Sequence, residues 1–103
     1  MNKNFRLCND LKELENTLKR IKLDDLEIIL WQNINSDKVI VHAHLIDYQV
    51  KNKNIYIEFH CRETQLIKKN KTLFLHCSEL KTLIKGTINS IKKTSIQLKI
   101  DSK

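Results

Sequence analysis

Downstream of Asp24 the chain alternates hydrophobic and polar residues with a period of two. Side chains of a β-strand point to opposite faces in turn, so this alternation predicts strands with one buried face. Five short segments and one long run, residues 39–50, carry the pattern and predict six strands. The inward-facing sets of the short segments are Leu26, Ile28 and Leu30; Ile55, Ile57, Phe59 and Cys61; Leu73, Leu75 and Cys77; Ile84, Gly86 and Ile88; and Ile96, Leu98 and Ile100.

The N-terminal region has helical spacing instead. Asp10 and Glu13 stand three residues apart, as the residues of a capping pair do at the start of a helix. One apolar stripe follows at helical spacing, which predicts a helix over about residues 10–21 with a single buried face. The stripe consists of Leu11, Leu14, Leu18 and Ile21.

The long run, residues 39–50, changes face part-way along. If Asn52 and Lys53 form a hairpin turn, the pairs on one face are Ile46–Phe59, Tyr48–Ile57 and Val50–Ile55. Upstream, the hydrophobic residues lie on the other face: Val39, Val41, Ala43 and Leu45. The change predicts a β-bulge near residues 45–46, which bends the strand as a small barrel requires.

The predicted fold class is mainly β. We expect a small six-stranded antiparallel barrel, or split barrel, with one N-terminal α-helix at about residues 10–21 and the barrel over 25–101. A chain of 103 residues and 12.2 kDa has room for a single domain, 1–103. Gly86 is its only glycine and predicts sharp coiling or a close backbone approach within a strand. With no proline either, glycine-rich phosphate loops are excluded.

Charge is distributed unevenly along the chain. The net charge is +7, but residues 1–50 carry −1 and residues 51–103 carry +8. Such an excess is typical of an anion-binding surface, and equally of lysines that only solvate strands. The three cysteines, the absence of a signal-peptide pattern and the absence of a membrane-length apolar run lead us to expect a cytoplasmic protein with no membrane span.

Histidine and cysteine are the first candidates for chemistry: His42, His44, His60, Cys61, His76 and Cys77. Neighbouring strand residues point to opposite faces, so the pairs at 60–61 and 76–77 cannot both reach one metal ion. We therefore expect buried thiols and outward imidazoles, with no metal, no cofactor and no catalytic residue. Asp47 lies opposite Glu58 in the hairpin register, and we expect that pair to be solvated and screened by Lys51 or Lys53.

Aromatic and basic residues are the remaining candidates. Tyr56 and Phe74 lie on outward faces, and lysines fill the loops at Lys68, Lys69, Lys71, Lys92 and Lys93. This combination predicts, as one alternative, a small basic nucleic-acid-binding β-barrel. Ile29 and Trp31 lie on the outer face of their strand. We expect the N-terminal helix to cover them, the alternative being a partner surface.

The order of elements resembles the N-terminal split-barrel domain of PilZ-type proteins, the flagellar-brake group. The likeness covers about residues 10–100 and rests on the segments Leu26–Gln32, Val39–Tyr48 and Leu83–Ile88. The cyclic di-GMP motifs of that family are missing. No two arginines stand four residues apart, and Lys81 and Leu83 occupy the Asp and Ser positions ahead of Gly86.

The resemblance implies a non-catalytic adaptor module that contacts another protein. It also implies a link to cyclic di-GMP signalling or motility, without binding of the nucleotide by this chain. The residue types best suited to such contacts, and therefore the predicted partner-binding residues, are Trp31, Tyr56, Phe74, Lys68, Lys69 and Lys71.

Overall fold

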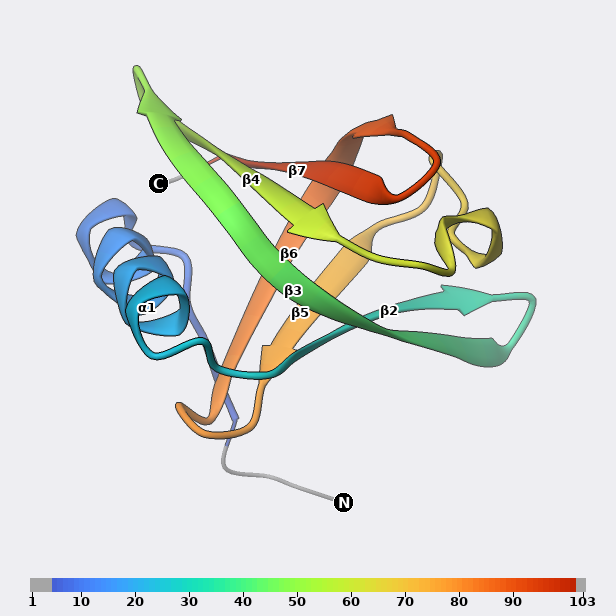
Figure 1. The fold of residues 1–103 in the computed structure, drawn as a ribbon, viewed down its shortest axis with the longest axis horizontal. Coiled ribbons are helices and arrows are strands. Elements are labelled where there is room, and N and C mark those ends of the chain that lie inside the picture. The colour runs from blue at the N-terminus through green and yellow to red at the C-terminus, as the bar shows by residue number, and fades with distance from the viewer. Residues whose placement is uncertain (1–4, 102–103) are drawn as a thin grey trace.

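The structure is a computed structural model that describes residues 5–101. Figure 1 shows strands curled around a common interior with one helix beside them. The elements in chain order are β1 (Arg6–Leu7), α1 (Leu11–Leu23), β2 (Ile28–Ile34), β3 (Asp37–Lys51), β4 (Asn54–His60), the short 3-10 helix η1 (Thr64–Leu66), β5 (Leu73–Cys77), β6 (Thr82–Ile91) and β7 (Ser95–Asp101).

The predicted six-stranded antiparallel barrel is confirmed, in its closed form. Hydrogen bonds join the strands in the order β1-β6-β5-β2-β3-β4-β7, and β7 pairs back onto β6. Two strands take part in both halves of the barrel, β3 by bending from β2 to β4 and β6 by passing from β5 to β7. β1, which no periodicity marks, adds two residues in parallel to β6.

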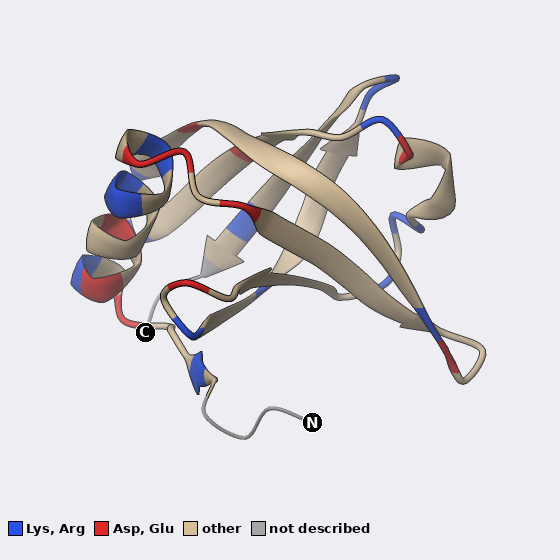
Figure 2. Cartoon of the chain, turned by 60° about the horizontal axis from the view of Figure 1, so that its bottom comes forward, with Lys and Arg blue, Asp and Glu red and all other residues tan. Residues whose placement is uncertain are grey.

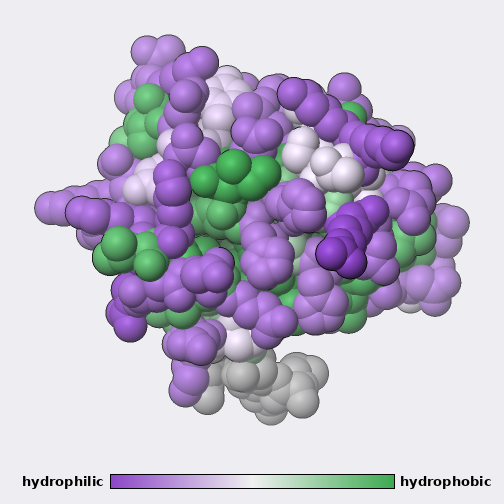
Figure 3. Space-filling view, viewed as in Figure 1, coloured by the Kyte–Doolittle hydropathy of each residue, from purple (hydrophilic) through white to green (hydrophobic). Residues whose placement is uncertain are grey.

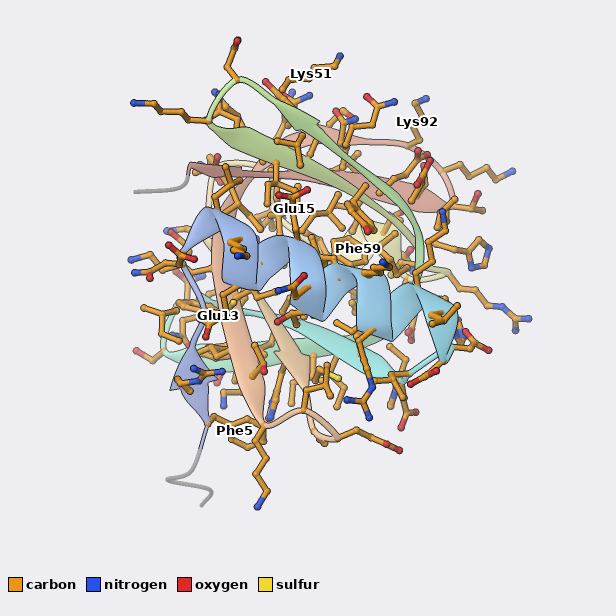
Figure 4. All side chains as sticks on the ribbon, turned by 90° about the vertical axis from the view of Figure 1, so that its left-hand side faces the viewer. Phe5, Glu13, Glu15, Lys51, Phe59 and Lys92 are labelled. Carbon is orange, nitrogen blue, oxygen red and sulfur yellow. The ribbon has the colours of Figure 1, made fainter. Side chains whose placement is uncertain are left out.

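Helix α1 forms where the capping pair and the apolar stripe predict it. The Asp10 side chain accepts a hydrogen bond from the Glu13 amide, and Arg20 and Lys22 occupy the last turn, where the helix dipole favours positive charge. The helix runs two residues beyond the predicted end at 21. Leu14, Leu18 and Ile21 of its stripe are buried and Leu11 is half-buried, and the helix lies in front of the strands in Figure 4.

The predicted bulge is confirmed, but one of the predicted pairs is wrong. The β3–β4 register shifts between Leu45 and Asp47, and Leu45 rather than Ile46 lies opposite Phe59. Ile46 is the bulged residue and is 44% exposed. The bulge takes Ile46 out of the pairing. Leu45, the residue before it, therefore points inward opposite Phe59.

The inward sets predicted by alternation form one core. Phe59 is its largest fully buried side chain, and the α1 residues Leu14, Leu18 and Ile21 belong to the same cluster. Gly86 lies where β6 leaves β5 for β7, and a Cβ there would be only 2.8 Å from the Lys99 carbonyl oxygen. The predicted close backbone approach is therefore confirmed. No helix within residues 5–101 is long and apolar enough to span a bilayer.

Candidate functional site

A stacked aromatic pair lies on the outside of the barrel. Trp31 of β2 and Phe74 of β5 are cross-strand partners, with ring centroids 4.2 Å apart and an interplanar angle of 14°. Their strand neighbours Leu30, Leu73 and Leu75 are fully buried, so alternation turns both rings outward. Both aromatic side chains are half-buried. Only the pairing of β2 with β5 brings these two predicted contact residues together.

Lys38 approaches the same indole ring from the neighbouring strand. β2 lies between β5 and β3, and the Lys38 ammonium nitrogen of β3 is 4.3 Å from the Trp31 ring centroid. The indole therefore stacks on Phe74 on one side and has a cation–π contact from the other. Its orientation is fixed by both neighbours. A nucleobase that stacked on Trp31 would first have to displace one of them.

The apolar surface continues on both sides of the aromatic pair. Ile40 lies opposite Trp31 and is 52% exposed, while Ile29 lies beside His76 on the same strands. Leu83 of β6 is the next neighbour of His76. We call this outer surface the aromatic face and define it by residues that share the outward direction: Ile29, Trp31, Ile40, Phe74, His76 and Leu83.

The expectation that the N-terminal helix covers Ile29 and Trp31 was wrong. The apolar stripe of α1 joins the interior cluster that contains Ile28 and Leu30, which are on the opposite face of β2. Neither Ile29 nor Trp31 packs against that cluster. The physical reason is that the helix closes the interior of the barrel, whereas alternation directs these two side chains away from it.

His76 lies between the aromatic face and the N-terminal segment. The Phe5 ring contacts it edge-on, with centroids 3.7 Å apart. Its Nε2 atom is buried and has no hydrogen-bond partner among residues 5–101. Burial, and secondarily the charge of Lys38, lower the pKa of the His76 imidazole below its usual value of 6.5. His76 is therefore neutral at physiological pH and behaves as part of the apolar surface.

Tyr56 lies on a different part of the barrel. It is on β4, where its cross-strand neighbours are Gln49 of β3 and Lys99 of β7. The Lys51 ammonium is 5.7 Å from its ring centroid. The structure therefore does not bring Tyr56 together with Trp31 and Phe74, and the three predicted aromatic residues do not form one surface.

The predicted lysines lie in a loop that a buried glutamine holds in place. The Gln32 side chain donates to the carbonyl oxygens of Lys68 (2.7 Å) and Lys71 (3.2 Å) and accepts from the Lys68 amide (2.8 Å). Gln32 itself is fully buried. It was missed as a functional residue, although a polar residue on the inward side of β2, in line with Ile28 and Leu30, signals a buried hydrogen-bonding role.

Basic residues gather around this loop from three segments. The Thr64 hydroxyl of η1 donates to the Lys93 carbonyl (2.8 Å), and the Cys61 amide donates to the Thr94 carbonyl (3.0 Å). These bonds join the β6–β7 turn to η1 and to the segment before it, and Figure 2 shows Lys and Arg positions around that end. We call this region the basic end. Its members are Arg62, Lys68, Lys69, Lys71, Lys92 and Lys93.

The cysteines are buried and the neighbouring histidine side chains point outward. Cys61 is 1% exposed and Cys77 is fully buried, whereas His60 is exposed and His76 half-buried, as alternation predicts. Burial raises the pKa of the Cys61 thiol and raises that of Cys8 to about 11, which keeps both thiols protonated. Within residues 5–101, no three His, Cys, Asp or Glu residues are placed to hold a metal ion.

Asp47 and Glu58 face each other across β3 and β4, as predicted. The Lys22 ammonium of α1, which the sequence did not single out, is 3.0 Å from the Asp47 carboxylate. The hydrogen bond from Lys22, followed by one from the Tyr48 amide, lowers the pKa of the Asp47 carboxyl. Asp47 is consequently ionised at neutral pH and is not poised to act there as a general acid.

An open hollow of about 620 Å³ lies between α1 and the β5–β6 turn, away from the predicted contact residues. Its charged lining includes Arg6 and Glu13, which form an ion pair of 2.6 Å with each other. Charges that neutralise one another leave little to orient a small ligand.

No protein-family model, no curated protein and no solved structure matches this chain significantly. The relationship to PilZ-type proteins therefore stays a prediction.

Proposed function

We propose that this chain is a non-catalytic module that binds another protein through the aromatic face. The observation that carries the proposal is the outward Trp31–Phe74 stack, which α1 leaves uncovered beside the exposed Ile40. Contiguous apolar surface on a folded domain is typical of interaction sites, and tryptophan anchors contribute disproportionately to binding. A ring already fixed by its neighbours loses little conformational entropy when a partner docks.

The charges beside the stack favour one kind of partner. Lys38 contacts the Trp31 ring, and exposed Lys85 lies opposite Phe74 on β6, so a lysine stands next to the pair on the strand at each side. A partner segment with an apolar anchor residue between carboxylates would complement both features. We therefore propose an acidic, partly apolar protein segment as the ligand of the aromatic face.

Chemistry elsewhere in the described chain supports binding rather than catalysis. The thiols of Cys8 and Cys61 are buried and held protonated, and Asp47 is engaged with Lys22. The resemblance to PilZ-type N-terminal domains also favours an adaptor, and the link to cyclic di-GMP signalling or motility rests on that resemblance alone. The free cysteines fit a reducing compartment such as the cytoplasm.

Two groups of predicted contact residues fall outside this proposal. Lys68, Lys69 and Lys71 belong to the basic end, and Tyr56 lies across the barrel.

The face seen in Figure 3 shows hydrophobic surface only in areas separated by hydrophilic side chains. The exposed apolar residues Leu23, Ile46 and Val50 come from α1 and the distal half of β3, away from the Trp31–Phe74 stack.

The proposal is tested by selecting binders from a random peptide library displayed on phage, with the full chain immobilised. We expect the selected peptides to share an aromatic or aliphatic anchor flanked by Asp or Glu. Titration of one such peptide, followed by amide chemical shifts, should perturb β2, β5 and the first half of β3, and leave the Tyr56 region of β4 unchanged.

The substitution Ile40→Asp places a carboxylate in the centre of the aromatic face and is expected to weaken peptide binding at least about tenfold, since it removes apolar contact and repels acidic ligands. Val50→Asp is the matched control, because Val50 is also an exposed apolar residue of β3. Equal loss in the two variants, or selected peptides with neither anchor nor carboxylates, would contradict the proposal.

A further inference from the structure

We propose that the basic end binds single-stranded nucleic acid through its phosphates, with little regard to base sequence. This surface is separate from the aromatic face, and the proposal does not rest on protein binding there. Each of its six basic side chains is exposed, and they come from the loops on either side of η1 and from the β6–β7 turn.

The charges of the basic end are not neutralised by the protein. Within residues 5–101, none of its six basic side chains takes part in an ion pair. Glu63 is the single acidic residue in the segments 62–71 and 92–94. By contrast, the cations Arg6, Arg20 and Lys22 at the α1 end are all paired with carboxylates. Clustered, unpaired cations attract a polyanion and release its counterions on binding.

Hydrogen bonds hold the backbone of the basic end in one shape. Gln32 fixes the loop at Lys68 and Lys71, and Thr64 fixes the β6–β7 turn at Lys93. The turn is closed by a bond from the Lys92 amide to the Ser95 carbonyl, 2.8 Å long. The charges are therefore positioned before a ligand arrives, which reduces the entropic cost of binding.

The residue types point to phosphate contact without base readout. Five of the six cations are lysines, which act as point charges, and Arg62 is the only one able to form a bidentate pair. Exposed Gln65 and Asn70 in the same segments can donate to phosphate and sugar oxygens. Trp31, whose ring is already engaged by Phe74 and Lys38, offers no free stacking surface for bases.

The same surface is poorly suited to a lipid bilayer. Leu66, 44% exposed, is the only large exposed hydrophobic residue in segments 62–71 and 92–94. Peripheral membrane binding generally combines cations with a broad apolar face or a lipid anchor. A polar, lysine-rich end therefore favours nucleic acid as the polyanion.

The test is fluorescence anisotropy of the full chain with a labelled oligothymidylate of about 12 nucleotides, within the length a barrel of this size covers. Titrations run from about 50 to about 200 mM salt. If each of the six cations neutralises one phosphate, the logarithm of the association constant should fall with the logarithm of salt concentration with a slope of about −4. A mixed-sequence strand should bind within about threefold of the same affinity, because stacking and sequence contribute little.

The variant Lys68→Gln/Lys69→Gln/Lys71→Gln should halve that slope to about −2 and weaken binding at low salt by more than about tenfold. Its matched control removes three lysines from elsewhere, Lys12→Gln/Lys19→Gln/Lys51→Gln, which gives the same net charge. The control should keep the slope within about one unit of the parent. Circular dichroism of both variants checks that the fold is kept.

Three outcomes overturn the proposal. The first is no binding of the oligonucleotide at low salt. The second is an equal effect of the two lysine variants, which would show that net charge rather than the basic end attracts the strand. The third is binding to phosphatidylserine vesicles with no binding to the oligonucleotide, which would assign the basic end to a membrane surface.

Discussion

Gly86 occupies a position at which the neighbouring strand leaves no room for a side chain. Its position lies where β6 exchanges β5 for β7 as its partner, and the crossing brings Leu98 and the Lys99 carbonyl against it. A single glycine inside an alternating segment was enough to predict this close approach. The residues that contact Gly86 could not be predicted, because periodicity shows which face of a strand a residue lies on but not which strand packs against it.

Gly86→Ala is expected to lower the free energy of unfolding by about 1–3 kcal/mol, because the new methyl group would be 2.8 Å from the Lys99 carbonyl oxygen and 2.9 Å from Leu98 Cγ. Urea denaturation measures the change. The neighbouring Lys85→Ala, at an exposed position of β6, serves as the control and should cost less than about 0.5 kcal/mol, as surface substitutions usually do. A Gly86→Ala protein as stable as its parent would contradict the crowding at this crossing.

His76 is the residue whose charge state matters most for the aromatic face. Its lowered pKa means that the unfolded chain takes up a proton more readily than the folded one. Stability from this group is therefore complete above the unfolded value of 6.5 and is lost as the pH falls through the lower, folded value.

Replacing His76 by Phe should flatten the acid side of the stability profile below about pH 6.5, where the contribution of this group begins to be lost. Urea midpoints measured across that range test this expectation, and the difference from the parent protein isolates His76 from the carboxylates. His44→Gln, at an exposed histidine of β3, is the control and should keep the parental slope. A His76→Phe profile parallel to the parental one would show that burial does not disfavour the imidazolium.

At the scale of elements, alternation and capping predicted most of what is seen. The helix, six strands and the bulge follow from residue periods that local physics imposes. The Trp31–Phe74 stack does not, because it depends on β2 pairing with β5, which are separated by two strands and η1 in the chain. The pattern also did not predict that Ile46 is the bulged residue, because a bulge at Leu45 or at Ile46 would change the face of the strand equally well.

The loop at 68–71 depends on one side chain. Gln32→Ala would remove three hydrogen bonds, to the Lys68 amide and to the carbonyl oxygens of Lys68 and Lys71; of these groups the Lys68 carbonyl would keep its bond from the Lys71 amide. We expect a loss of about 3 kcal/mol in unfolding free energy, at about 1 kcal/mol per bond. Hydrogen exchange should show faster exchange of the Lys68 amide. Gln49→Ala, on the exposed face of β3, is the control and should change neither the unfolding free energy nor the exchange of the Lys68 amide. An equal loss of stability in the two variants would contradict the role given to Gln32.

The whole molecule has two chemically different ends. Arg6, Arg20 and Lys22 at the α1 end are paired with carboxylates, whereas the six cations of the basic end form no ion pair within residues 5–101. The charge difference between the halves of the sequence thus becomes spatial because η1, its loop and the β6–β7 turn all lie in the second half. Closure of the barrel brings the loops around η1 next to the β6–β7 turn. Counting charges along the chain does not predict this contact.

The three buried thiols report on unfolding of the whole barrel. Cys8, Cys61 and Cys77 are at most 1% exposed, so a maleimide should label them only when the barrel opens. The raised pKa of Cys8 adds a pH dependence. Its thiolate is favoured in the unfolded chain, so the contribution of Cys8 to stability should be constant below about pH 9 and fall as the pH rises towards about 11.

The control for this pH effect is Cys8→Ala, which should lose part of the alkaline decline relative to the parent protein. Labelling at rates typical of a free thiol in native buffer would contradict the burial of the cysteines. Urea midpoints measure the pH effect, and mass spectrometry of the maleimide-treated chain measures the labelling.

The position of β7 in the sequence has a consequence for biosynthesis. Ser95–Asp101 is the last strand of the barrel, and it hydrogen-bonds to both β4 and β6. Until the ribosome has released those residues, two earlier strands display open edges that invite pairing with other chains. A nascent chain stalled before Ser95 should accordingly be a substrate for chaperones, and emergence of β7 from the ribosome should end that dependence.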